Sequence, residues 1–157
     1  MLKVFVDLWD KNKDVLEKAL RNINDIRTLE YHHLVQITFE GIYNHNNNVD
    51  VAHYKRINIG EISEIDNGYC QGTLLYLIPF DTYQQDESDY LMTYVGYGSC
   101  SGCDTLLSII DSDNEQPTDK QVKDLMVLCK DIITNTIKPY NCAWRKNKMF
   151  DTVEIND

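Results

Sequence analysis

The sequence predicts an α+β fold in which a three-stranded antiparallel sheet, a meander, packs against an N-terminal and a C-terminal helix. Three observations support this prediction. Apolar residues recur at three-to-four spacing at the beginning of the chain and again over residues 122–137. Between these regions lie strand-like segments that are separated by turn residues. The 157 residues, of which 43% are hydrophobic, fit a single compact domain over residues 1–157.

The first part of the chain is expected to be helical. The apolar spacing over residues 2–23 predicts an amphipathic helix, with a break near residues 10–12. A second helix is expected over residues 31–42, with Thr28 as a candidate cap. Because apolar residues also alternate over residues 35–39, a strand stays open as an alternative for this segment.

The sheet is expected from the middle of the chain. Residues 56–65 alternate imperfectly around Gly60 and lead into residues 66–68, Asp-Asn-Gly. This tripeptide is a strong hairpin signal, because Asn and Gly tolerate positive φ. A returning strand follows over residues 69–78, and residues 90–97 form the third strand after a polar loop.

Two helices are expected after the sheet. Asp104 can cap a short helix that runs through Ile110, and the Thr118-x-x-Gln121 pattern is a capping box for a longer helix. Its apolar stripe lies within residues 122–137, and Pro139 is expected to end it. The apolar residues of the segment 144–155 are expected to pack or to add a strand.

The charge is distributed unevenly along the chain. The net charge is −10, yet no Lys or Arg occurs from Ile57 to Asp119, where 12 acidic residues lie. We call this stretch the acidic block. The rest of the chain holds 13 acidic and 15 basic residues, so the whole negative excess comes from the block. Such a charge favours solubility and opposes binding to nucleic acid, so no direct nucleic-acid contact is expected.

The sequence predicts a cytosolic protein without a membrane partner. No apolar run approaches 18 residues, and charges at Lys3, Asp7 and Asp10 interrupt the N-terminus. The five cysteines are an odd number and lack the spacing of a disulfide framework, so reduced thiols are expected. Cys129 lies on the apolar stripe of the last helix, where it is expected to behave as a small hydrophobic residue.

A glycine-rich turn with two cysteines is the main candidate site. Gly98, Cys100, Gly102, Cys103 and Asp104 lie between the third strand and the short helix, where they could form a ligand or metal turn. A C-x-x-C pair before a helix is typical of thiol redox chemistry, but the expected meander and the acidic surroundings argue against it here. The preferred interpretation is a turn of structural thiols, held by the two glycines.

Two further interpretations of this turn are a metal site and a phosphate-binding loop. The cysteine spacing matches half of a zinc site, but a second pair is missing, and no metal is expected. Glycines before a helix also suggest a phosphate-binding loop, although neither the dinucleotide nor the P-loop pattern is matched. We therefore expect no cofactor, and no complete catalytic signature indicates an enzyme.

Three stretches, GTLLYLIPFDTYQ, YLMTYVGYGSCSGCDTL and QVKDLMVLC, carry a resemblance to a known family. They resemble small uncharacterised proteins that are encoded by tailed bacteriophages, over about residues 30–135. The YGSCSGCDTL string is the most distinctive part. The resemblance implies a viral accessory protein that acts in the cytoplasm of a bacterial host, and it implies no mechanism.

The function expected from this setting and from the charge is binding. We expect a non-enzymatic accessory protein whose acidic surface mimics nucleic acid and inhibits a host protein with a basic surface, for example one of anti-phage defence. Whether the protein forms a homodimer stays open. The alternative is a small-nucleotide sponge, or a zinc or redox protein, that uses residues 96–104. The residues expected to bind the partner are Asp81, Tyr83, Asp86, Glu87, Asp89, Asp111 and Asp113.

Overall fold

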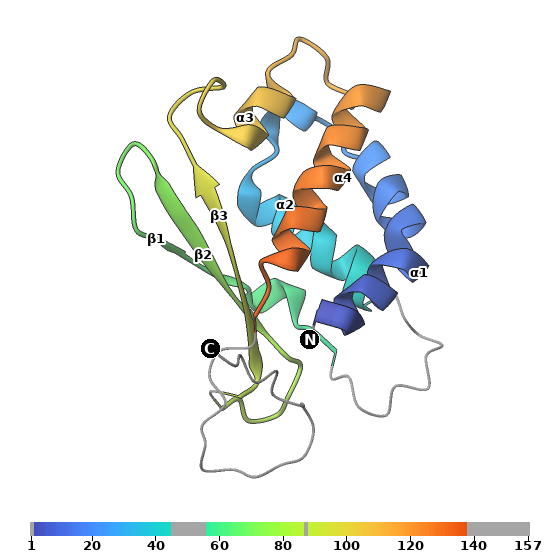
Figure 1. Ribbon diagram of the computed structural model, residues 1–157, viewed down its shortest axis with the longest axis vertical. Helices are drawn as coiled ribbons and strands as arrows, with labels where there is room; N and C mark the ends of the chain where they lie inside the picture. The colour runs from blue at the N-terminus through green and yellow to red at the C-terminus, as the bar shows by residue number, and fades with distance from the viewer. Residues whose placement is uncertain (1, 45–55, 87, 138–157) are drawn as a thin grey trace, which may run out of the picture.

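A layer of helices covers one face of an antiparallel sheet in the computed structural model, which describes residues 2–44, 56–86 and 88–137 (Figure 1). Glu87, Pro139 and the segment 144–155 lie outside the described residues. The elements in chain order are α1 (Leu2–Arg21), α2 (Tyr31–Phe39), β1 (Ser63–Asp66), β2 (Gly72–Pro79), β3 (Tyr90–Tyr97), α3 (Thr105–Ile110) and α4 (Asp119–Thr134). Short 3₁₀ turns lie at Ile26–Thr28 and Ile59–Glu61, and a π-helical turn follows α2 at Glu40–Asn44.

The sheet is the predicted meander, with strand order β1-β2-β3 and both pairs antiparallel. The first strand is shorter than expected: after an isolated bridge between Ile57 and Phe80, the segment around Gly60 forms a 3₁₀ turn, and the continuous strand begins at Ser63. The Asp-Asn-Gly hairpin is confirmed, but its loop is longer than two residues and β2 begins at Gly72. The Asn67 side chain holds this loop by accepting a hydrogen bond of 2.8 Å from the Thr73 N–H.

Helix α1 is continuous, so the break expected near residues 10–12 is wrong. Asn12 is buried in the middle of the helix, and its side-chain amide donates a 2.9 Å hydrogen bond to the carbonyl of Ile42. A polar residue in this position is stabilised because the π-helical turn after α2 supplies its partner. The sequence around Asn12 gives no sign of that distant carbonyl.

Residues 35–39, for which a strand was the alternative to a helix, belong to helix α2. The expected cap Thr28 lies in the preceding 3₁₀ turn, where its hydroxyl donates to the carbonyl of Asp25. Glu30 occupies the N-cap position and makes no side-chain cap bond. The buried side chains Leu34, Val35, Thr38 and Phe39 all face the core, which favours helix over strand at this place.

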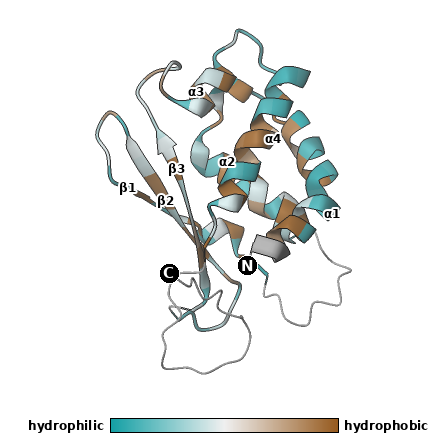
Figure 2. Cartoon of the chain, viewed as in Figure 1, coloured by the Kyte–Doolittle hydropathy of each residue, from teal (hydrophilic) through white to brown (hydrophobic). Residues whose placement is uncertain are grey.

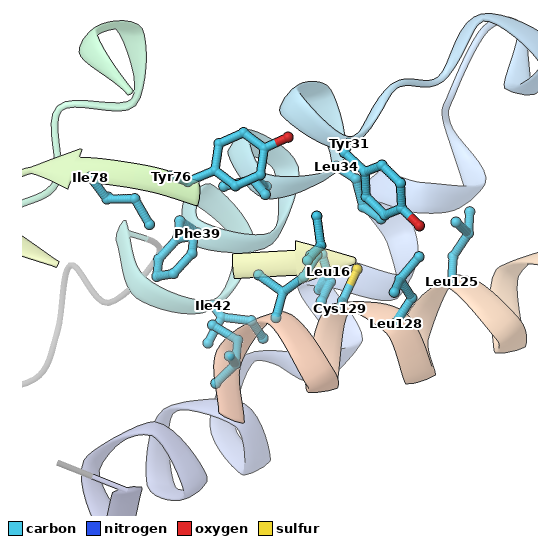
Figure 3. Close-up of a cluster of buried hydrophobic side chains, with 14 of the residues drawn as sticks. Leu16, Tyr31, Leu34, Phe39, Ile42, Tyr76, Ile78, Leu125, Leu128 and Cys129 are labelled. Atoms are coloured by element: carbon cyan, nitrogen blue, oxygen red, sulfur yellow. The ribbon is translucent and has the colours of Figure 1, made fainter. Parts of the chain in front are cut away.

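The core lies between the sheet and helices α1, α2 and α4 (Figure 3). Tyr76 and Ile78 enter it from β2, Phe39 from α2, and Leu16 from α1. Apolar colour follows the inward sides of the helices, while their outward sides are polar (Figure 2). Cys129 is fully buried on α4, and this burial raises the pKa of its thiol to about 12, which confirms it as a small core residue.

Helix α4 begins as predicted and ends earlier. Thr118 and Gln121 form the reciprocal capping box. The helix ends at Thr134, so the last apolar residue of the expected stripe, Ile137, leaves it and forms an isolated antiparallel bridge with Met92 of β3. The N–H of each residue donates to the carbonyl of the other at 2.8 Å.

In the part of the chain that is described, no helix has the length and apolar character needed to cross a membrane.

Candidate functional site

The turn between β3 and α3 is closed by its own backbone. The carbonyl of Cys100 accepts hydrogen bonds of 2.9 Å from the N–H groups of both Cys103 and Asp104. The Cys100 N–H donates in turn to the Cys103 sulfur at 3.1 Å. The two cysteine side chains are therefore brought to the same side of the turn, and both are exposed.

The two thiols are in direct contact. The Sγ atoms of Cys100 and Cys103 lie 2.8 Å apart, within hydrogen-bonding distance. The hydrogen bond from Cys100 is the largest cause that holds the pKa of the Cys103 thiol below its ordinary value, and backbone and side-chain groups of Ser99 act in the same direction. A lowered pKa increases the fraction of thiolate, which is the nucleophilic form.

Asp104 is a buried carboxylate that holds the turn in place by accepting hydrogen bonds. It is only 4% exposed, and its carboxylate accepts hydrogen bonds from the N–H groups of Gly98 and Leu107 and from the hydroxyl of Tyr31, at 2.9, 2.8 and 3.2 Å. The bond to Leu107 is the predicted cap of α3. Burial raises the pKa of Tyr31 to about 12, and the nearby Asp104 carboxylate acts in the same direction. Asp104 thus joins the end of β3 to α2 and α3.

The two glycines of the turn differ in what surrounds them. A Cβ on Gly98 would lie 2.5 Å from the Cys103 sulfur and 2.6 Å from the Cys103 carbonyl oxygen, so only glycine fits. A Cβ on Gly102 would meet nothing closer than the Cys100 sulfur at 4.0 Å, and its φ is not in the left-handed region. The expected need for glycine is therefore supported at Gly98 and is wrong at Gly102.

The turn does not assemble a metal site from the described residues. Among residues 2–44, 56–86 and 88–137, no three His, Cys, Asp or Glu side chains form a group that could hold a metal ion. Asp104, the nearest carboxylate in the chain, faces the backbone of the turn, and Cys129 is buried on α4. The sequence also contains His45 and His53, which could act as metal ligands only if the fold brought them to the turn, and both lie outside the described residues.

An open groove of about 530 Å³ lies between this turn and α4. Cys103 lines it and Cys100 does not. The other lining residues are Ser101, Gly102, Asp104, Thr105, Ser108 and Ile109 on the side of the turn and α3, and Asp124, Val127, Leu128 and Asp131 on α4. No Lys or Arg of the described chain is among them, so the groove lacks the cations that usually hold a phosphate.

The residues predicted to bind a partner do not gather on one face. Asp81, Tyr83 and Asp86 lie in the loop between β2 and β3, whereas Asp111 and Asp113 lie in the loop between α3 and α4, at the opposite end of the molecule (Figure 1). Strand β3 separates the two ends, and its eight residues span about 25 Å at the usual rise of a strand. Glu87 lies outside the described residues.

Asp89 is not part of an exposed surface, which corrects its expected role. It is 6% exposed, and its carboxylate accepts a hydrogen bond from the N–H of Asp86 at 3.3 Å. Its carbonyl accepts another from the N–H of Phe80 at 2.8 Å. Asp89 therefore closes the loop between β2 and β3, where its carboxylate accepts from a backbone donor of the loop.

Much of the acidic block has structural partners. The Glu64 carboxylate accepts a hydrogen bond of 2.7 Å from the Tyr76 hydroxyl, and burial together with this bond raises the pKa of Tyr76. At the other end of the block, ion pairs join Glu115 to Arg27 at 3.0 Å and Asp119 to Arg21 at 2.6 Å. These arginines come from the N-terminal part of the chain, so the tertiary fold places basic residues beside the end of the block.

Sequence reasoning missed the groove and its α4 wall. Asp124 and Asp131 follow the usual pattern of an exposed helical face, and only their position opposite Cys103 distinguishes them. One signal was present in the sequence, because the apolar residue Val127 lies outside the predicted apolar stripe. In the structure its side chain is 62% exposed.

Comparison of the chain with protein-family models, with curated proteins and with solved structures found no match.

Proposed function

We propose that the protein is a dithiol–disulfide protein whose Cys100 and Cys103 thiols oxidise to an intramolecular disulfide and are reduced again. One observation carries this proposal: the two sulfur atoms lie 2.8 Å apart on an exposed turn. Formation of the bond requires a further approach of less than about 1 Å, since a disulfide is about 2.05 Å long. The lowered pKa of Cys103 supports the assignment of Cys103 as the attacking thiol.

The reaction is thiol–disulfide exchange with an external disulfide, RSSR. The Cys103 thiolate attacks one sulfur, the bond between Cys103 and that sulfur forms, and the other half leaves as a thiolate that takes up a proton. The Cys100 thiol then loses its proton and attacks the Cys103 sulfur, which expels the second half. The protein dithiol and RSSR thus become the protein disulfide and two RSH molecules.

A redox titration tests this proposal. The purified chain is equilibrated in buffers of reduced and oxidised glutathione, alkylated, and analysed by peptide mass spectrometry. We expect one two-electron transition that joins Cys100 to Cys103. Cys100→Ser and Cys103→Ser should each abolish it. Cys70→Ser is the matched control, because Cys70 is also exposed but lies in the loop between β1 and β2. A folded protein that keeps both thiols in the most oxidising buffer contradicts the proposal.

The pH dependence of alkylation tests the role of Cys103 separately. Because its pKa is lowered, its thiolate persists to lower pH, and its alkylation rate should reach half of the maximum below the ordinary thiol value of about 8.5. The hydrogen bond from Cys100 is the largest cause, so Cys100→Ala should move this midpoint up, towards the ordinary value. An unchanged midpoint in Cys100→Ala contradicts the assignment of Cys103 as the activated thiol.

A second proposal retains the acidic binding surface in a narrower form. We propose that Asp81, Tyr83 and Asp86 contact the basic surface of a host protein. The supporting observation is that Tyr83 is fully exposed between two exposed carboxylates. Exposed tyrosines are enriched at protein interfaces, and complementary charge raises the rate of association.

Comparative capture from the bacterial host that the resemblance implies tests this second proposal. A protein that binds the wild-type chain should be lost with the double variant Asp81→Lys, Tyr83→Ser, and its binding should weaken as salt rises. Asp86 is left intact because its carboxylate accepts a hydrogen bond from the Ser88 N–H. The control is Asp111→Lys with Asp113→Lys, at the opposite end. Equal capture by both double variants argues against the loop as the contact.

A further inference from the structure

We infer that the groove between the Cys100–Cys103 turn and α4 selects disulfides that carry a positive charge and presents them to Cys103. This inference rests on the dithiol function proposed above and adds the chemical class of its substrate. It follows from which cysteine lines the groove, from the charges of its α4 wall, and from the exposed apolar surface between those charges.

The groove gives the two cysteines different roles. Cys103 lines it, while Cys100 does not, although the two sulfur atoms are 2.8 Å apart. A disulfide held in the groove therefore meets Cys103 first. Once the mixed disulfide has formed, the Cys100 sulfur is within reach of the Cys103 sulfur for the second attack. The cysteine that lines the groove is also the one whose thiol pKa is lowered.

The α4 wall of the groove carries negative charge. Asp124 and Asp131 are seven residues apart and lie on the same helix face, on either side of Val127. The Asp124 carboxylate is 2.6 Å from the Lys120 ammonium, whereas Asp131 takes part in no ion pair within the described chain. Asp131 is thus the carboxylate that a cation in the groove can neutralise without displacing a partner.

Apart from Lys120, which pairs with Asp124, the lysines of α4 do not offset the charge of the groove. Lys123 and Lys130 are exposed on α4, but neither lines the groove. The positive charge of Lys123 acts on Asp119, whose pKa is lowered mainly by its hydrogen bond with Arg21 and in small part by Lys123. The groove keeps an acidic wall, which favours a cationic ligand and opposes an anionic one.

The remaining surface suits the short apolar arms of a small disulfide or a peptide side chain. Val127, which is 62% exposed, lies between the two carboxylates and offers contact to methylene groups. Ser101, Thr105 and Ser108 line the groove on the side of the turn and α3, and a hydroxyl can donate to or accept from polar groups of a ligand. The groove therefore combines a nucleophile, an anionic wall and a small apolar surface.

Three small symmetric disulfides of similar size test this selectivity. Cystamine carries two ammonium groups, bis(hydroxyethyl) disulfide is neutral, and dithiodiglycolate carries two carboxylates. The rate of oxidation of the Cys100–Cys103 pair by each is divided by its rate with 2-mercaptoethanol, a thiol without a charged substituent, which removes differences in intrinsic reactivity. We expect the normalised rates to fall in the order cationic, neutral, anionic, by about tenfold from first to last at low salt.

Variants locate the source of this order. Asp131→Asn should lower the cationic-to-anionic ratio by about three- to fivefold, the size expected for loss of one close charge that is screened nearly as in water. Asp7→Asn is the matched control, because it removes the same charge from an exposed position in the first turns of α1, a helix that does not line the groove, and it should leave the ratio unchanged. In the unmodified protein, raising the salt to about 1 M, where the screening length is about 3 Å, should largely remove the preference.

The outcomes separate the two levels of the proposal. If all three disulfides oxidise the pair but the normalised rates are equal, or if Asp7→Asn changes the ratio as much as Asp131→Asn, the groove does not select charge, and the dithiol function stands. If none of the three oxidises a folded protein, the dithiol function itself is wrong. The salt dependence uses no variant, so it tests the selectivity even if Asp131→Asn alters the fold.

Discussion

At the scale of single residues, identical amino acids in the Cys100–Cys103 turn have different importance. Gly98 is required because the Cys103 sulfur and backbone occupy the space where a Cβ would lie. Gly102, only four residues later, faces open space. The lowered pKa of the Cys103 thiol is likewise a property of its contact with Cys100, and the exposed Cys70 has no such contact in the described chain.

The two glycines provide a matched pair of variants. Gly98→Ala should destabilise the protein by about 1–3 kcal/mol, as overpacking does, and should displace Cys103 from Cys100. Gly102→Ala should change the free energy of unfolding by less than about 0.5 kcal/mol. Urea unfolding of the reduced proteins measures both effects. Equal losses in the two variants would mean that the turn is not arranged as described.

At the scale of elements, Asp104 connects parts of the chain that are far apart in sequence. Its carboxylate caps α3, accepts from the N–H of Gly98 at the end of β3, and accepts from Tyr31 of α2. The sequence predicted only the first of these roles, because a cap is recognisable from local order. The other two depend on how the sheet and α2 pack, which places the dithiol turn on a support of three elements.

Replacement of this carboxylate should affect both stability and the thiols. Asp104→Ala leaves the donors of Gly98, Leu107 and Tyr31 without their acceptor, and we expect a loss of about 2–4 kcal/mol. The alkylation rate of Cys103 should change in the same variant, because the turn loses its support. Asp111→Ala, at an exposed position at the end of α3, is the control and should stay within about 0.5 kcal/mol of wild type. A wild-type stability for Asp104→Ala would show that the buried carboxylate is dispensable.

At the scale of the whole molecule, the fold divides the acidic block between distant places. Some carboxylates accept hydrogen bonds from buried tyrosines, and others pair with arginines of the N-terminal part of the chain. The exposed residues Asp81, Asp86, Asp111 and Asp113 lie at the two ends of β3. The interior also contains two tyrosines, Tyr31 and Tyr76, whose raised pKa values tie the stability of the whole fold to pH.

The stability should fall at alkaline pH. The pKa of Tyr31 is about 12 in the folded protein and about 10 when unfolded, so only the unfolded chain releases this proton between pH 10 and pH 12. The stability contributed by Tyr31 is therefore complete below pH 10 and is lost as the pH rises towards 12, and Tyr76 acts in the same direction. Urea unfolding measured from pH 8 to pH 12 checks this slope.

Two phenylalanine variants identify the tyrosine that is responsible. Tyr31→Phe should be less stable at pH 8, because its hydrogen bonds with Asp104 and the Leu106 N–H are lost, but its stability should fall less steeply above pH 10. Tyr83→Phe, at a fully exposed position, should behave as wild type. A slope that is equally steep in Tyr31→Phe would assign the alkaline loss to other groups.

The sequence by itself determined the elements whose signals are local. The meander, the third strand at residues 90–97, the Asp104 cap and the Thr118–Gln121 capping box follow from neighbouring residues, and all are present in the structure. The bacteriophage resemblance and the host cytoplasm stay predictions. Only the tertiary structure decided which acidic residues are exposed, that Asn12 fits inside a helix, and that α4 forms a groove beside Cys103. Each of these depends on partners that are distant in sequence, and periodicity and spacing carry no information about such contacts.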